Sequence, residues 1–199
     1  MNLFNIGVEG QYRLAGVVAA GAGASLALPG PLRVVGVILV AVLVGAAWAG
    51  IAGALRAYRG VSEVISTIML NAIALGLTPF LLTRYLAADK SGESGANYAV
   101  RTATIPKGGR LPHLDFLVPV GVPAGVHLNP FIVIAALVGI GYWVLIWRSR
   151  FGFDLRASGS NPHAARASGV DAKRMTVIAM VISGAAAGLV GLSTILSSP

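Results

Sequence analysis

The chain has 199 residues, of which 56% are hydrophobic and 11% are charged, and its formal net charge is +8. Soluble domains usually carry about 25% charged residues, so this composition excludes an ordinary soluble domain and indicates a membrane protein. No cysteine is present, which excludes disulfides and thiolate metal sites. The positive charge is expected in basic loops that orient membrane spans, and no nucleic-acid partner is expected.

Apolar segments follow one another along the chain and predict an all-α bundle of membrane-spanning helices in a single domain, 1–199. The five segments are 14–28, 34–55, 61–86, 131–147 and 175–196. The first is shorter than the roughly 20 residues that a helix needs to cross the hydrocarbon core. It therefore either begins earlier, in the LFNIGVEGQY stretch, or is a broken or partly re-entrant helix. The sequence after Met1 is not typical of a cleavable signal peptide.

The loops between the segments predict the orientation of the chain. The loops 56–60 and 148–174 hold eight basic residues in 32 positions, whereas 29–33 and 87–128 hold five in 47. Because cytoplasmic loops are enriched in Lys and Arg, the first two loops and the N-terminus are expected in the cytoplasm. The region 87–128 is then an external loop, which acts either as a surface connector or in binding.

Small residues recur at four-residue spacing in two of the segments. Gly45, Ala49 and Gly53 follow this spacing in the second segment, and Gly184 and Gly188 follow it in the fifth. Such spacing lets helix backbones approach closely in a membrane. It predicts close packing without identifying the partner helix.

The third segment carries polar side chains on one helical face. Glu63, Thr67 and Asn71 are spaced four residues apart, Thr78 lies seven residues further on, and Ser66 borders the same face. Polar residues inside a membrane are functional by default, so this face predicts a path for a polar solute. Hydrogen bonding between helices explains the same residues equally well.

The stretch NIGVEGQYR near the N-terminus offers a similar choice. Glu9 and Arg13 have the spacing and order favoured for a helical ion pair, and Asn5 and Gln11 add donors and acceptors. The stretch either lines a cavity with non-helical backbone or is an exposed cytoplasmic lead-in. Asn5 and Glu9 are therefore included among the candidate pathway residues.

The basic loop 148–174 contains the signals of a short helix. Asn161 is a good N-cap, Pro162 suits the first helical position and Gly169 suits a left-handed stop, which predicts a helix over 162–168. A helix of about seven residues is marginal by itself, so it must be supported or must dock on another molecule. Its expected surface consists of small residues and one projecting cation: Ala164, Ala165, Ala167 and Arg166.

Motifs for other chemistry are not found. The sequence has no GxxxxGK[ST] phosphate loop, so ATP binding of that kind is not expected. The histidines His113, His127 and His163 are scattered, and neither a metal site nor a cofactor is expected. We therefore expect no enzyme activity from this chain alone.

Four stretches, in order along the chain, resemble a known family. LRASGSNPHAARASG resembles the cytoplasmic coupling loop, close to LRAVGxNPxAAxxxGI, of ABC-transporter permeases of the branched-chain amino acid, ribose and nucleoside type. FNIGVEGQ looks like the early-membrane motif of this family. EVISTIMLNAIA and RTATIPKGGRLP look like a helix and the external loop of its nucleoside and simple-sugar branch. Ser158 replaces the usual Val, and His163 stands where Glu is common.

The resemblance implies a permease subunit of an importer for a small polar solute, a nucleoside or a simple sugar, in the bacterial plasma membrane. It also implies ATP-binding subunits, a second permease subunit and an extracytoplasmic solute-binding protein as partners. Family members are usually longer, so the chain resembles the middle of such a permease. The residues expected to couple to the ATPase are Arg156, Gly159, Asn161, Pro162, Ala164, Ala165, Arg166 and Gly169.

Two other functional classes are kept beside this one. A membrane scaffold or remnant that does not transport would share the same composition. A secondary carrier would need no ATPase, although the lack of an intramembrane carboxylate series argues against it.

Overall fold

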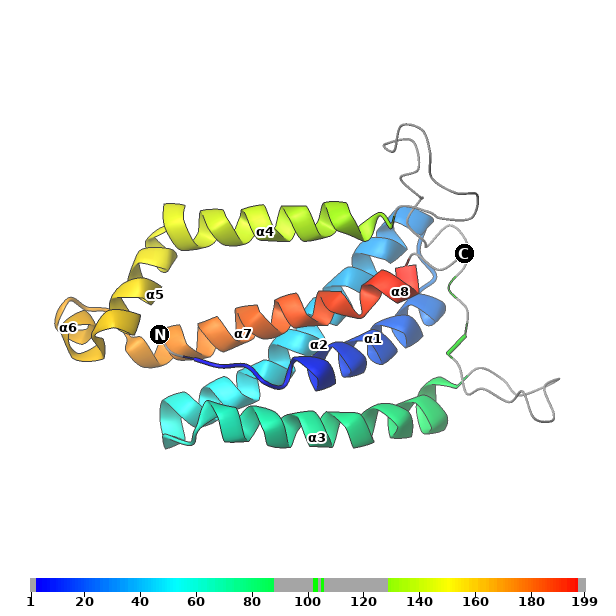
Figure 1. The fold of residues 1–199 in the computed structure, drawn as a ribbon. Coiled ribbons are helices and arrows are strands. Elements are labelled where there is room, and N and C mark those ends of the chain that lie inside the picture. The colour runs from blue at the N-terminus through cyan, green and yellow to red at the C-terminus, as the bar shows by residue number, and fades with distance from the viewer. Residues whose placement is uncertain (1–2, 88–101, 104, 106–128, 197–199) are drawn as a thin grey trace, which may run out of the picture.

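The computed structural model describes residues 3–87, 102–103, 105 and 129–196, and these form a bundle of helices (Figure 1). In chain order the elements are α1 (Val8–Ser25), α2 (Gly30–Arg59), α3 (Glu63–Leu81), the π-helical turn η1 (Leu82–Leu86), α4 (Phe131–Arg148), α5 (Arg150–Ser160), α6 (Pro162–Ala167), α7 (Ala172–Val190) and α8 (Leu192–Leu196). Among the described residues, four helical segments are long and apolar enough to cross a membrane: α2, α3 with η1, α4, and α7 with α8. The predicted all-α polytopic membrane fold is confirmed.

The first predicted segment takes a different form from the other four. Helix α1 is not one of the four candidate spans, and it lies inside the bundle beside α2, α3 and α7. Figure 1 shows that it begins partway along α7 and runs toward the α8 end. It is a single helix that starts at Val8, and the residues before it are not helical. The helix starts earlier than the apolar run, as the first alternative predicts, and it is continuous from Val8 to Ser25.

Helices α2 and α7 form the tightest contact of the bundle. A Cβ atom added to Gly184 would overlap the carbonyl oxygen of Gly45, and one added to Gly188 would overlap the carbonyl oxygen of Ala41. Side chains at these glycines would therefore force the two backbones apart. The close packing predicted from the small residues is confirmed, and each of the two patterned helices is the partner of the other.

The hydrophobic core lies among α1, α2 and α8, where small and branched apolar side chains are fully or almost fully buried. Its members are Ala15, Ala19, Val34, Val37, Ala41, Leu192 and Leu196. Alanine dominates the part that α1 contributes because this helix is enclosed by its neighbours, and only small side chains allow that closeness.

Helix α4 differs from the other candidate spans because none of its residues is buried. Tyr142, Trp143 and Trp147 lie toward its end, where an aromatic belt at the membrane interface is expected. The guanidinium carbon of Arg148 lies 5.4 Å from the centroid of the Trp143 ring, a cation–π contact. The apolar length of α4 and its aromatic end fit a helix that faces lipid or other protein segments.

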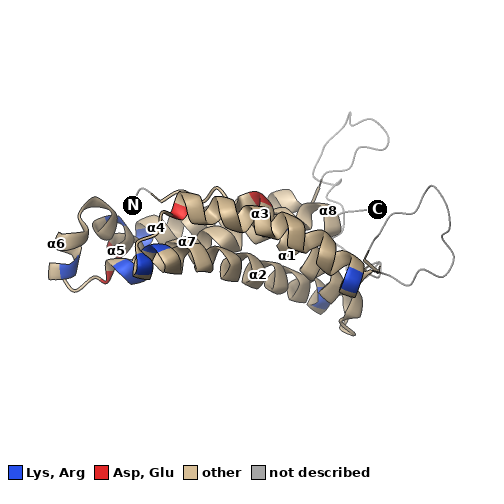
Figure 2. Cartoon of the chain, turned by 90° about the horizontal axis from the view of Figure 1, so that it is seen from below, with Lys and Arg blue, Asp and Glu red and all other residues tan. Residues whose placement is uncertain are grey.

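The basic segments meet at one end of the bundle. Figure 2 shows Lys and Arg gathered around α5, α6 and the start of α7. Arg56, near the end of α2, lines the same cavity as residues of α5 and α6. This is the common side that the orientation rule predicted for the two basic loops. The predicted external loop 87–128, with His113 and His127, lies outside the described residues except for Ala87, 102–103 and 105.

Candidate functional site

Two regions contain the candidate residues: a short capped helix at the basic end, and a polar layer inside the bundle. In the first region the Asn161 side-chain oxygen accepts hydrogen bonds from the backbone N–H groups of His163 (3.0 Å) and Ala164 (3.1 Å). Pro162 occupies the first helical position, and Gly169 has a φ of +83°. The predicted caps are therefore confirmed. The helix ends at Ala167, one residue earlier than predicted.

The predicted surface of α6 needs one correction. Ala165 is only 4% exposed, and its carbonyl oxygen accepts a hydrogen bond from the N–H of Val170 at 2.9 Å. The chain leaving α6 folds back over this side of the helix, so Ala165 is not on the surface that could meet a partner. His163, Ala164, Arg166 and Ala167 are exposed. The ATPase-coupling role of the α6 residues stays a prediction.

A second helix, α5, precedes α6 in the segment that the sequence indicated as a loop with one helix. The hydroxyl of Ser149 caps α5 by accepting the N–H of Gly152 at 3.1 Å. A Cβ at Gly152 would overlap the carbonyl oxygens of Leu145 and Ile146, so glycine allows the chain to turn from α4 into α5. The sequence did not predict this helix, because two glycines and two serines are among its 11 residues and both residue types have low helix propensity.

Arg156 of α5 contacts the end of α4. Its guanidinium donates a hydrogen bond to the carbonyl oxygen of Ile146 and lies 4.9 Å from the centroid of the Trp147 ring. Arg156 therefore holds α5 against the end of α4.

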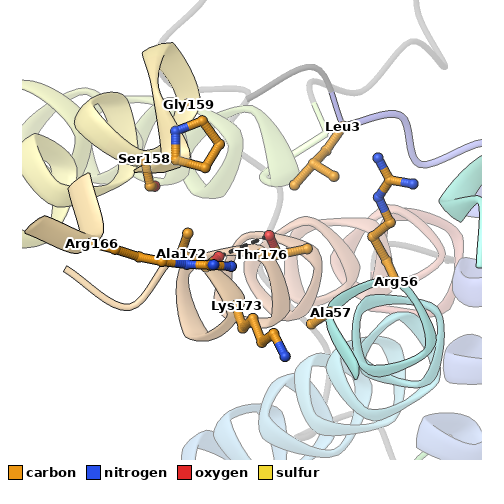
Figure 3. Close-up of a pocket in the computed structure, with 10 residues that line it drawn as sticks. Leu3, Arg56, Ala57, Ser158, Gly159, Arg166, Ala172, Lys173 and Thr176 are labelled. Carbon is orange, nitrogen blue, oxygen red and sulfur yellow. Dashed lines mark hydrogen bonds between the residues drawn. The ribbon is translucent and has the colours of Figure 1, made fainter. Parts of the chain in front are cut away.

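A cavity of about 400 Å³ lies between α6 and the membrane helices (Figure 3). Three cationic side chains from three helices line it, namely Arg56 of α2, Arg166 of α6 and Lys173 of α7. Figure 3 shows Arg166 reaching from α6 toward Ala172 and Thr176 at the start of α7. Arg166 therefore borders the space between α6 and the start of α7. Gly159 and Pro162, both coupling candidates, also line this cavity.

Glu63 anchors the turn between α2 and α3 at the same end. Its carboxylate lies 3.2 Å from the Nε atom of Arg56, and its side chain is only 8% exposed. Gly60, with a φ of +69°, closes α2 in the left-handed conformation and lets the chain reverse. Glu63 therefore contacts the basic cavity indirectly, through Arg56.

The polar layer begins with the non-helical residues before α1. Asn5 and Gln11 exchange two amide hydrogen bonds of 2.9 Å, and the Asn5 amide nitrogen also donates to the hydroxyl of Ser183 at 3.0 Å. Gln11 is only 1% exposed. Asn5 and Gln11 therefore attach one side of the N-terminal stretch to the bundle, while Phe4 and Ile6 on its other side are exposed. Ser183 is the member of this layer that sequence reasoning did not include, because only the fold brings α7 to Asn5.

The polar face of α3 completes the layer from the other side. The Asn71 side-chain oxygen accepts the N–H of Gly10 at 2.6 Å, and the Thr67 hydroxyl accepts the N–H of Ile6 at 3.3 Å. The first N–H groups of a helix have no partner within it, and lipid supplies none. Asn71 therefore caps the start of α1 from a neighbouring helix. Gly10 permits this contact, since a Cβ there would lie 2.7 Å from the Cβ of Ala74.

The other two residues of the α3 face lie in different settings. The hydroxyl of Ser66 is buried, and no hydrogen-bond partner for it is found among the described residues. The hydroxyl of Thr78 donates to the carbonyl oxygen of Ala74 at 2.7 Å and lies at the wall of a second cavity. Glu9 and Arg13 form the predicted ion pair at 2.7 Å. Contact of these candidates with a solute stays a prediction.

The chain was compared with known proteins. Residues 1–198 match the model of the family described as branched-chain amino acid transport system / permease component. The guanosine ABC transporter permease protein NupP of Bacillus subtilis is 34% identical over 191 residues, which cover 95% of this chain and 51% of the relative. The glucose ABC transporter permease protein TsgB13 of Haloferax volcanii is 32% identical over 98% of this chain and 50% of the relative.

A third relative is the D-allose transport system permease protein AlsC of Escherichia coli, 28% identical over 94% of this chain and 49% of the relative. The chain thus spans about half the length of these curated relatives. No solved structure matches it. Because the family model covers almost every residue, the chain belongs to the family of permease components of branched-chain amino acid transport systems.

Proposed function

We propose that the chain is part of the membrane-spanning permease subunit of an ABC importer that carries a small, neutral, polar solute, either a nucleoside or a simple sugar. The observation that carries this proposal is its similarity, along nearly its whole length, to permeases named for guanosine and for glucose. Candidate spans that enclose a polar layer support it. Solutes of these two classes carry several hydroxyl groups and need hydrogen-bond partners along their path.

The proposed energy source is ATP hydrolysis in partner subunits, which would bind at the basic end. Helix α6 offers its exposed residues there, and Arg166 lines a cavity together with Lys173 and Thr176 at the start of α7. A partner that moves α6 would thereby move a candidate span. A second permease subunit and an extracytoplasmic solute-binding protein complete the proposed assembly, which we place in the bacterial plasma membrane.

Within the pathway, the candidates divide into two groups. Glu9 and Thr78 are proposed to lie along the solute path, because Thr78 lines a cavity and Glu9 pairs with a residue that lines the same cavity. Asn5, Thr67 and Asn71 are proposed to hold its wall through the hydrogen bonds of the polar layer. Glu63 and Ser66 are proposed to extend this wall toward the basic end.

The experiment compares solute uptake by three kinds of cells: wild-type cells, cells in which the gene is deleted, and deleted cells in which it is restored at its own locus. Radiolabelled guanosine and glucose are supplied separately. The proposal expects that deletion abolishes uptake of at least one of them and that the restored gene recovers it. Equal uptake of both solutes with and without the gene would contradict the proposed transport function and favour a scaffold or remnant.

A further inference from the structure

Glu9 and Arg13 form an ion pair on a half-exposed face of α1. Their side chains are 49% and 50% exposed, and their charged atoms are 2.7 Å apart. The neighbouring Gly10 bonds to Asn71, which lies eight residues into α3, roughly 12 Å from the start of that candidate span at 1.5 Å per residue. The pair therefore lies within the span that runs from Glu63 to Leu86, roughly a third of the way from its Glu63 end or further.

Lipid is an unsuitable environment for this pair. Charged side chains within a span are costly against hydrocarbon, and they normally face water or other protein groups. Since half of each side chain is uncovered, the face of α1 that bears them is expected to meet water or polar groups of other protein segments.

A cavity lies along the same face of α1. Its volume is about 440 Å³, and it is an open pocket bordered by α1, the end of α3 with η1, and the region around α8. The lining side chains that can form hydrogen bonds are Tyr12, Arg13, Thr78, Thr102 and Thr194. Arg13 is the one charged group among the described residues that line it. Apolar side chains such as Val17 and Ile195 form the rest of the wall.

The wall formed by the end of α3 has an irregular backbone. Pro79 removes one backbone N–H from the helix, and the following residues form the π-helical turn η1. Leu82, the first residue of that turn, lines the cavity.

We propose that this cavity binds the transported solute on the outer half of the pathway and that Arg13 determines specificity there. The inference rests on the proposed function and assigns its binding site. A guanidinium has five N–H donors, so Arg13 can keep its bond to Glu9 and still donate to a hydroxyl or carbonyl oxygen of the solute. The tyrosine and threonine hydroxyls supply further partners, and the apolar wall suits a sugar face or a base. Because Glu9 balances the charge of Arg13, the cavity favours a neutral solute.

Glu9 has a different role, that of a positioning residue. It acts by holding the guanidinium of Arg13, so the substitution of Glu9 should raise the KM of uptake only while Arg13 is present. The comparison of E9Q, R13Q and the double variant E9Q/R13Q measures this dependence.

The test uses uptake of guanosine and of glucose by the intact transporter, expressed from its own locus, with membrane levels of the permease measured in parallel. R13Q is expected to raise the KM roughly tenfold or more, the scale of one lost charge-assisted hydrogen bond, with an unchanged membrane level. E9Q is expected to raise the KM less, and E9Q/R13Q should have the KM of R13Q. The matched control is R174Q, which breaks the exposed pair of Arg174 and Asp171.

A second pair of variants keeps the test decisive if R13Q fails to reach the membrane. T194V removes a hydroxyl from the opposite wall and should raise the KM, whereas T83V changes an exposed threonine that does not line the cavity and should not. Wild-type KM values in R13Q and T194V, with uptake intact, would overturn the inference but leave the proposed function standing. Failure of the wild type to take up either solute would overturn both.

Discussion

The amide of Asn5 donates a hydrogen bond of 3.0 Å to the hydroxyl of Ser183, joining the N-terminal segment to α7 across 178 positions of sequence. Asn71 makes the matching contact from α3 to the start of α1. Together they fix a stretch of non-helical backbone at a depth where lipid would leave its polar groups without partners. The residues that looked like a solute path along α3 are thus also part of the packing of α1.

Asn71→Ala tests this cap directly. The N–H of Gly10 would lose its acceptor inside the bundle, which should cost about 1–3 kcal/mol of stability. Thermal unfolding of the purified protein in detergent measures the loss. Ile73→Ala is the control, since Ile73 is exposed in this structure. A destabilised Ile73→Ala beside an unchanged Asn71→Ala would mean that the wrong face of α3 has been assigned to the interior.

Gly184→Ala tests the contact between α2 and α7. The added methyl group would overlap the carbonyl oxygen of Gly45, and forced separation of the helices should cost about 1–3 kcal/mol. Gly139→Ala is the matched control in α4, because nothing lies within 4 Å of a Cβ at that position. It should be neutral or slightly stabilising, since alanine favours helix more than glycine does. Equal unfolding temperatures for the two variants would contradict the packing described for α2 and α7.

Asn161→Ala tests the role of α6. Loss of the cap should cost about 1 kcal/mol, which is enough to unfold a six-residue helix that is marginal by itself. Uptake should fall while the amount of permease in the membrane stays constant. Ser160→Ala is the control, because that exposed hydroxyl bonds only to the carbonyl oxygen of Ala157. Full uptake by Asn161→Ala, with α6 shown to be unfolded, would remove this helix from the coupling mechanism.

The sequence predicted the features that depend on residues close together in the chain. The caps of α6 at Asn161 and Gly169 and the ion pair of Glu9 with Arg13 are local, so residue type and spacing were sufficient. Helix α5 was not predicted from the sequence because its helix propensity is weak. The Ser149 cap and the contacts of Arg156 with α4 compensate for this weakness.

Features that depend on distant residues could not be predicted in the same way. The small residues of α2 and α7 predicted close packing, but only the fold shows that Gly45 packs against Gly184. The polar face of α3 was recognised, whereas its contacts with Ile6 and Gly10 depend on a segment about 60 residues earlier. Spacing identifies the face of a helix, and the tertiary arrangement decides what that face meets.

The energy source of uptake tests the central claim most directly. Cells that express the intact transporter are assayed for uptake of the transported solute, guanosine or glucose, under two treatments. One depletes ATP while the ion gradients are maintained, and the other collapses the proton gradient while ATP is maintained. The account predicts that uptake is lost on ATP depletion and persists without the gradient. Uptake that survives ATP depletion and stops with the gradient would identify a secondary carrier and contradict it.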